Sequence, residues 1–164
     1  MRALIFELRP ESLEADGLVI SINRKIEAVR ARLGIVAQAI TSEEPEAPLE
    51  VKEALYRIAQ EALQNMVKHA HPRRVDVNLK TRRNTVALEI ADDGAGFDTA
   101  VAFPGHLGLQ SMRERALEVG GSFEILSSRG HGTRIVVRVP SAPRDRRRRE
   151  RTSARSVDLQ SRPP

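Results

Sequence analysis

Two runs of alternating apolar and polar residues near the middle of the chain constrain its fold more than any other feature. The first run covers residues 75–79, the second covers residues 86–90, and a polar turn at residues 82–84 separates them. This pattern predicts a β-hairpin, because alternate side chains of a strand point to opposite faces of the sheet. One face of the hairpin is apolar, so a second layer of the protein must cover it.

Patterns elsewhere in the chain supply that second layer. The predicted helices cover residues 1–8, 18–33, 49–70 and 109–119, and the further strands cover residues 35–41, 123–126 and 135–139. Pro10, Gly34 and Pro72 stand where the first three helices are expected to end. This order predicts an α+β fold, a two-layer sandwich in which helices cover one face of a mostly antiparallel mixed sheet.

Charge is distributed unevenly along the chain. Residues 141–164 contain eight of the 27 basic side chains but only three of the 22 acidic ones, so residues 1–140 carry no net charge. The Arg-rich segment has few apolar residues, and we expect it to be a disordered tail. Its basic run at residues 146–149 has no aromatic or base-reading neighbours, so no specific nucleic-acid partner is expected.

Several common kinds of site are excluded by the sequence. The chain has no cysteine, no Walker or Rossmann glycine motif, and four histidines that lack the spacing of a metal site. It also has no run of about 20 apolar residues, the length needed to span a membrane. The first residues are too few and too acidic for a signal peptide. We therefore expect a cytoplasmic protein.

A narrow polar stripe runs along the predicted helix at residues 49–70. On a helical wheel of about 100° per residue, Arg57, Asn65 and Lys68 fall within about 40° of Glu61. The opposite, apolar face consists of Leu55, Ala59, Ala62, Leu63 and Met66. The stripe is either a solvated helix face or a site where Glu61 and Asn65 offer oxygen ligands to Mg²⁺ next to a phosphate.

Two glycine-rich segments follow the predicted hairpin. Residues 92–97 read DDGAGF and come directly after a strand, so Asp92 can accept a hydrogen bond from a base amine while the glycines admit a ligand close to the backbone. The same letters are also typical of an acidic hairpin turn. Residues 105–109 read GHLGL and open a helix, whose N-terminus favours an anion.

Taken in order, these segments resemble the histidine kinase ATPase module of the GHKL superfamily, in particular sensor kinases that work with LuxR/NarL-type response regulators. Residues 56–70 (YRIAQEALQNMVKHA) look like the N box, residues 92–97 like the first glycine box, residues 105–116 (GHLGLQSMRERA) like the second, and residues 132–133 like the closing Gly-Thr pair. Residues 4–10 resemble the end of the dimerisation helices. The resemblance implies a Bergerat-type ATP-binding fold that takes ATP and Mg²⁺.

The resemblance also implies a role for each matching residue. Glu61 would orient or deprotonate the attacking group, Asn65 would coordinate Mg²⁺ with Glu61 as a second candidate ligand, and Lys68 would contact phosphates. Asp92 would accept a hydrogen bond from the adenine amine with help from Thr133, and residues 97–104 would form a lid. The full predicted ATP-binding set is Asn65, Lys68, His69, Asp92, Gly94, Gly96, Gly105, Leu107, Gly108, Leu109 and Thr133.

One feature departs from the family pattern. The family's phosphoacceptor lies in a Glu-Leu-His-Asp-like stretch of the first dimerisation helix, and nothing like it occurs here. We therefore expect a dimerisation-helix remnant at residues 1–15, an ATPase domain at residues 16–140 and a tail at residues 141–164. The expected partners are a separate dimerisation domain that carries the acceptor histidine, and a response regulator. Two alternatives stay open, a stand-alone GHKL serine kinase of the anti-sigma type and a non-catalytic ATP-sensing docking module.

Overall fold

The computed structural model describes residues 10–41, 43–99 and 106–141. Four sequence predictions fall wholly or mostly outside these residues. They are the helical piece at residues 1–8, the greater part of the lid at residues 97–104, the glycine at position 105 and the tail after residue 141.

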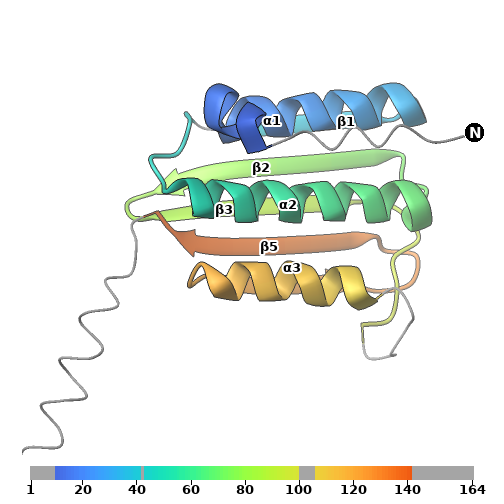
Figure 1. Cartoon of the computed structure of the whole chain (residues 1–164). Coiled ribbons are helices and arrows are strands. Elements are labelled where there is room, and N and C mark those ends of the chain that lie inside the picture. The colour runs from blue at the N-terminus through green and yellow to red at the C-terminus, as the bar shows by residue number, and fades with distance from the viewer. Residues whose placement is uncertain (1–9, 42, 100–105, 142–164) are drawn as a thin grey trace, which may run out of the picture.

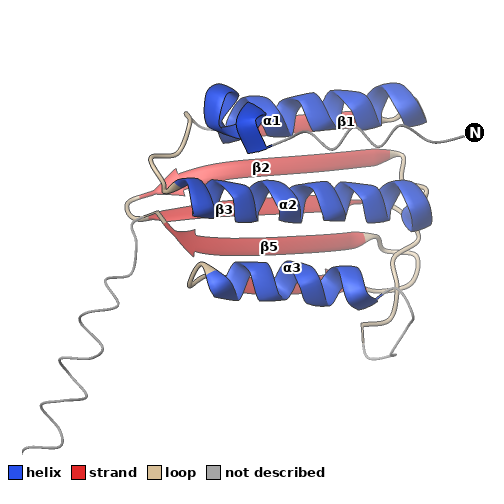
Figure 2. Ribbon diagram, viewed as in Figure 1, coloured by secondary structure: helices blue, strands red, loops and turns tan. Residues whose placement is uncertain are grey.

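The described residues form an α+β fold of two layers. In chain order the elements are α1 (Pro10–Leu33), β1 (Val36–Thr41), α2 (Leu49–Asn65), the π-helical turn η1 (Met66–Ala70), β2 (Arg74–Arg82), β3 (Thr85–Asp92), α3 (His106–Glu118), β4 (Ser122–Ser127) and β5 (Thr133–Pro140). The strands make one five-stranded sheet in the order β1-β2-β3-β5-β4. Strand β1 is parallel to β2, and the other neighbours are antiparallel. The three α-helices lie side by side over one face of this sheet (Figures 1 and 2), which confirms the predicted fold class.

The core lies between the helices and that face of the sheet. Val75, Val77 and Leu79 of β2 are fully buried, as the alternating pattern predicts, and so are Leu88 and Ile90 of β3. The helices contribute an equally buried set of side chains, namely Leu18, Ile22, Leu55, Ile58 and Leu63. Each such side chain stabilises the fold by about 1.5–3 kcal/mol relative to exposure, so this contact fixes α2 firmly over β3 and β5.

The opposite face of the sheet carries charged side chains together with the exposed apolar side chains of Val36, Ile40 and Leu126. Ion pairs join Arg74 Nε to Asp76 Oδ2 at 2.8 Å within β2, and Arg138 of β5 to Glu124 of β4 at 2.9 Å. Both arginines are about half exposed, so these pairs add little stability. The fully buried side chains of β2 and β3 all lie on the helix-covered face, which is the one that builds the core.

Helix α1 differs from the sequence prediction at its start. The pattern predicts a helix from residue 18, but α1 already begins at Pro10, a position where the missing N–H of proline costs no hydrogen bond. Gly17 then interrupts the helix with φ 83° and ψ 172°. At this kink the Glu44 carboxylate accepts hydrogen bonds from the N–H groups of Leu18 and Val19, both at 2.8 Å. Glu44 thereby acts as an N-cap for the second part of α1, although it comes from a distant loop.

Candidate functional site

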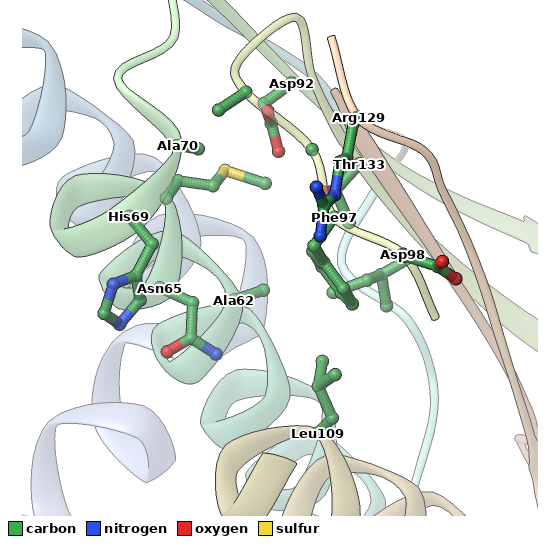
Figure 3. A pocket seen from close by; sticks show the side chains of 14 residues that line it. Ala62, Asn65, His69, Ala70, Asp92, Phe97, Asp98, Leu109, Arg129 and Thr133 are labelled. Atoms are coloured by element: carbon green, nitrogen blue, oxygen red, sulfur yellow. The ribbon is translucent and has the colours of Figure 1, made fainter. Parts of the chain in front are cut away.

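Four element ends meet at one end of the molecule. The C-terminal end of α2 with η1, the end of β3, the start of α3 and the start of β5 all lie on the same side in Figure 1. The cavity between them measures about 560 Å³, a size typical of small-molecule sites. It is lined by Ala62, Asn65, Met66, His69, Ala70, Asp92, Ala95, Gly96, Phe97, Asp98, Leu109, Arg129, Thr133 and Ile135 (Figure 3).

Asp92 is the most unusual polar group of this cavity. The residue is only 9% exposed, and its Oδ1 accepts a hydrogen bond from the Gly94 N–H at 2.8 Å. Its Oδ2 is buried without a hydrogen-bond partner among the described residues, a condition shared only by the Tyr56 hydroxyl, which does not line the cavity. A buried acceptor without a donor is costly for the protein alone. Asp92 therefore offers an acceptor to a ligand with an N–H group.

Burial also changes the acidity of Asp92. Loss of hydration raises the pKa of this carboxyl above its ordinary value, and the N–H groups of Gly94 and Thr133 only partly oppose that effect. The charged form is therefore held in the cavity at a cost in free energy. A donor from a ligand would repay part of that cost.

The adjacent Asp93 has a different task. Its Oδ1 accepts hydrogen bonds from the N–H groups of Arg73 and Arg74, both at 2.8 Å. The N–H groups of Arg74 and Arg73 hold the pKa of Asp93 below its ordinary value, against an opposing effect of burial. Asp93 thus fastens the loop after β3 to the start of β2, while Asp92 faces the cavity.

The glycines of the first glycine-rich segment are required by packing inside the protein. A Cβ on Gly94 would lie 2.3 Å from the carbonyl oxygen of Ala70, and one on Gly96 would lie 2.1 Å from that of Ser128. The N–H of Ala95 between them donates to the Ala70 carbonyl at 2.8 Å. The segment is thus wedged between η1 and the β4–β5 turn. Gly96 lines the cavity and Gly94 does not.

Glu61 and Asn65 meet the first turn of α3. A Cβ on Gly108 would lie 2.4 Å from Glu61 Oε1 and 3.2 Å from Asn65 Nδ2. Glu61 itself does not line the cavity, whereas Asn65 does. Glu61 therefore lies at the N-terminal end of α3, the end predicted to bind phosphate. The positive end of the helix dipole stabilises a negative carboxylate there.

Lys68 and His69 both lie in the π-helical turn η1, but only His69 lines the cavity. Its backbone N–H groups bond one residue further back than in an α-helix, so each residue advances by a smaller angle than the α-helical wheel assumes. As a result His69, although exposed to solvent, lines the cavity next to Asn65. Lys68 is also exposed, but it is not among the lining residues. The turn ends at His71, which has the left-handed φ of 46°.

Some of the other predicted site residues line the cavity and some do not. Leu109 and Thr133 line the cavity, and the Thr133 hydroxyl lies 3.0 Å from that of Ser127. Leu107 is 78% exposed and does not line it. The glycine at position 105 lies outside the described residues.

Some lining residues were not predicted as site residues. Ala62 and Met66 belong to the face that the wheel assigned to the core; they are buried there as predicted, but their ends also border the cavity. The others are Ala70, Ala95, Phe97, Asp98, Arg129 and Ile135. Phe97 was visible as the last letter of the first glycine-rich segment, whereas Arg129 belongs to a turn without a motif.

Comparison with known proteins identifies the fold and its class. The family described as "Histidine kinase-, DNA gyrase B-, and HSP90-like ATPase" matches residues 50–143. The chain belongs to this ATPase family, and it corresponds to the ATPase domain of sensor histidine kinases. The resemblance to the histidine kinase ATPase module that was inferred from the sequence is thereby confirmed.

Two sensor kinases are similar to this chain in sequence. The chain is 35% identical over 154 residues to the sensor histidine kinase LiaS of Bacillus subtilis (strain 168), covering 94% of this chain and 42% of that protein. It is 35% identical over 141 residues to the sensor protein VraS of Staphylococcus aureus (strain COL), covering 85% of this chain and 40% of that protein. The chain thus spans less than half the length of these relatives.

Solved structures agree on the fold. The histidine kinase domain of the Erythrobacter litoralis EL346 blue-light activated histidine kinase superimposes with a TM-score of 0.65 at 20% identity, over 76% of this chain and 61% of that one. The catalytic domain of histidine kinase ThkA gives a TM-score of 0.62 at 17% identity, over 77% and 91%. None of the helices in the described part of this chain is long and apolar enough to cross a membrane.

Proposed function

We propose that this domain binds Mg²⁺-ATP in the cavity and donates the γ-phosphoryl group to a histidine on a sensor kinase dimerisation domain, in the cytoplasm. A response regulator, of the LuxR/NarL type, would then receive the phosphoryl group. The observation that carries the proposal is the buried Asp92 Oδ2, which lines the cavity without a donor. The family match and the sensor kinase relatives supply the reaction class.

The adenine end of the site would be at Asp92 and Thr133. The exocyclic amine of adenine is a donor of the kind that Asp92 Oδ2 lacks, whereas guanine presents a carbonyl at the same edge. Thr133 is the partner of Asp92 in the β3–β5 register, so its hydroxyl stands beside the carboxylate. Ala62, Met66 and Ala70 offer an apolar surface to the base from the helix side.

The phosphate end would be at Glu61, Asn65 and the start of α3. Asn65 offers the oxygen ligand that fits Mg²⁺, and Glu61, one helical turn away, is a second candidate ligand. Within the described residues no cluster of three or more acidic or histidine side chains could hold a metal ion by itself. That also fits Mg²⁺, which takes few protein ligands and completes its shell with phosphate and water. Bound Mg²⁺ would neutralise charge on the phosphates, and Lys68 and His69 would add contacts.

The transfer itself asks for positioning rather than covalent chemistry by the domain. A nitrogen of the acceptor imidazole attacks the γ-phosphorus, a nitrogen–phosphorus bond forms, and the bond from phosphorus to the β,γ-bridging oxygen breaks. ADP leaves with that oxygen. Glu61 orients the imidazole and accepts its proton, and the first turn of α3 faces the phosphates.

The sensor kinase relatives favour this reading over a stand-alone serine kinase of the anti-sigma type. Residues 1–15 are proposed as the end of a dimerisation helix, residues 16–140 as the ATPase domain and residues 141–164 as a tail. Leu13, within the first of these segments, is buried in the common core, so the helix end would be packed directly on the ATPase domain.

The test supplies the acceptor in trans. The chain is incubated with γ-labelled ATP, Mg²⁺ and a separately produced sensor kinase dimerisation domain, with an acceptor His→Gln version as the control. We expect acid-labile, base-stable label on the intact acceptor only, and its loss with Asn65→Ala. Saturable ATP binding without any such label would leave a nucleotide-binding module and refute the transfer.

A further inference from the structure

Arg129 brings a charge to the cavity that no motif accounts for. It lies in the turn between β4 and β5, and it is the only lysine or arginine among the lining residues that the structure describes. Figure 3 shows its side chain extending from that turn toward the cavity, on the wall that carries Thr133 and Phe97. The helix wall with Asn65 and His69 lies opposite.

The turn that carries Arg129 is fixed in place. The Gly130 N–H donates to the Ala95 carbonyl at 2.7 Å, and the Phe97 N–H donates to Ser127 Oγ at 2.9 Å. Ser127 Oγ in turn donates to the Gly132 carbonyl at 2.8 Å. The turn is therefore tied to the segment after Asp92, and the backbone of Arg129 holds a constant position relative to that carboxylate.

The guanidinium of Arg129 is not engaged elsewhere. No ion pair or hydrogen bond of this group occurs within the described ranges, where six other ion pairs are formed, including those of Arg134 and Arg138 on the outer face of β5. A guanidinium is planar and weakly hydrated, so it stacks readily on an aromatic ring. Here it stands on the Asp92 side of the cavity.

We infer that Arg129 binds the base and ribose of the nucleotide, with its guanidinium plane against the purine. The inference rests on the proposed function, because it takes the ligand to be an adenine nucleotide with its amine at Asp92. Arg129 would close the cavity on the side facing Met66 and Ala70, so the base lies between an apolar helix wall and a cation. Its contribution would be to nucleotide affinity and not to transfer of the phosphoryl group.

The test compares a nucleoside with a nucleotide on three variants of the full chain. Arg129→Ala removes the group, Arg129→Lys keeps the charge without the plane, and Arg82→Ala alters an exposed arginine at the opposite end of β2. Adenosine binding is followed by NMR shift titration and Mg²⁺-ATP binding by calorimetry.

For Arg129→Ala we expect both ligands to bind about 2- to 30-fold more weakly, the range of a cation–π contact. Arg129→Lys should recover only part of this loss, and Arg82→Ala should match the wild type. Weaker ATP binding with unchanged adenosine binding would mean a phosphate contact and overturn the inference, as would unchanged binding of both. If wild-type chain binds neither ligand, the proposed function fails as well, so the two failures are distinguishable.

Discussion

Replacing Asp92 by Asn should make the domain more stable and worse at binding ATP. The Asn side chain has the same shape, and its Oδ1 can keep the hydrogen bond from the Gly94 N–H, 2.8 Å long in the structure. What disappears is the negative charge of a residue that is only 9% exposed. Burying a charge without a partner for each oxygen costs free energy. We expect a gain on the order of 1 kcal/mol for the unliganded variant, or a few degrees in Tm.

The pH dependence gives this prediction a second signature. Because burial raises the pKa of Asp92 in the folded state, the folded form binds its proton more tightly than the unfolded form. The wild type should therefore lose stability as pH rises from the ordinary carboxyl range through the raised pKa. The variant has no such group, so the difference in free energy of unfolding between the two proteins should grow over that window and be constant above it.

The affinity of the Asp92→Asn variant for ATP should fall, although its stability rises. The Asn Nδ2 presents a donor to the adenine amine, which is also a donor. Loss of a hydrogen bond to a charged group costs about 1.5–3 kcal/mol, or roughly 10- to 100-fold in affinity. Thermal unfolding from pH 4 to 8 and calorimetric titration with Mg²⁺-ATP measure both effects. A variant that is less stable than the wild type and binds ATP equally well would refute the reasoning.

Three further predictions follow from the geometry. Gly132→Ala should destabilise the domain by about 2–4 kcal/mol in urea unfolding, because φ is 70° and the new Cβ would lie 1.9 Å from the Asp92 carbonyl oxygen. Gly130→Ala, with φ 78° but no atom within 4 Å of the new Cβ, should cost only about 1 kcal/mol, and equal losses of stability in the two variants would contradict this. Asn65→Ala and Glu61→Gln should abolish Mg²⁺-dependent phosphoryl transfer to the separately supplied acceptor domain. The free energy of unfolding should change by less than about 1 kcal/mol, since neither residue is buried. A larger loss of stability would mean that the two side chains have a structural role. Glu44 is partly buried, which favours protonation, but hydrogen bonds from Lys52 and from two N–H groups of α1 lower its pKa. Glu44→Ala should therefore destabilise the domain by about 1 kcal/mol at neutral pH, and this difference should fade as pH falls through the lowered pKa. A pH-independent effect would rule out the cap.

Much of this molecule follows from short-range pattern. Alternation in β2 and β3 predicted which side chains are buried, and the strand-then-glycine order made Asp92 a candidate, although the same letters also fit an acidic hairpin turn. Thr133 came only from the resemblance of residues 132–133 to the family's closing Gly-Thr pair. The burial predicted for the two strands is confirmed, because burial and strand register repeat every two residues.

Other features depend on contacts between distant segments. The π-helical turn after Asn65 redirects Lys68 and His69, and no local signal distinguishes it from a continued α-helix. Gly94 is needed because Ala70 packs against it, 24 positions earlier in the chain, and Arg129 reaches the cavity only because hydrogen bonds bring its turn to the segment after Asp92. Such relations appear in the sequence as single letters without a pattern.

The central claim is that the cavity binds adenine nucleotide with the base at Asp92, and calorimetric titration of the wild-type chain with Mg²⁺-ATP and Mg²⁺-GTP tests it most directly. We expect one saturable site for ATP. GTP should bind at least about 10-fold more weakly, because its carbonyl would face the Asp92 carboxylate. Equal affinities for the two nucleotides, or no heat of binding for ATP, would contradict it.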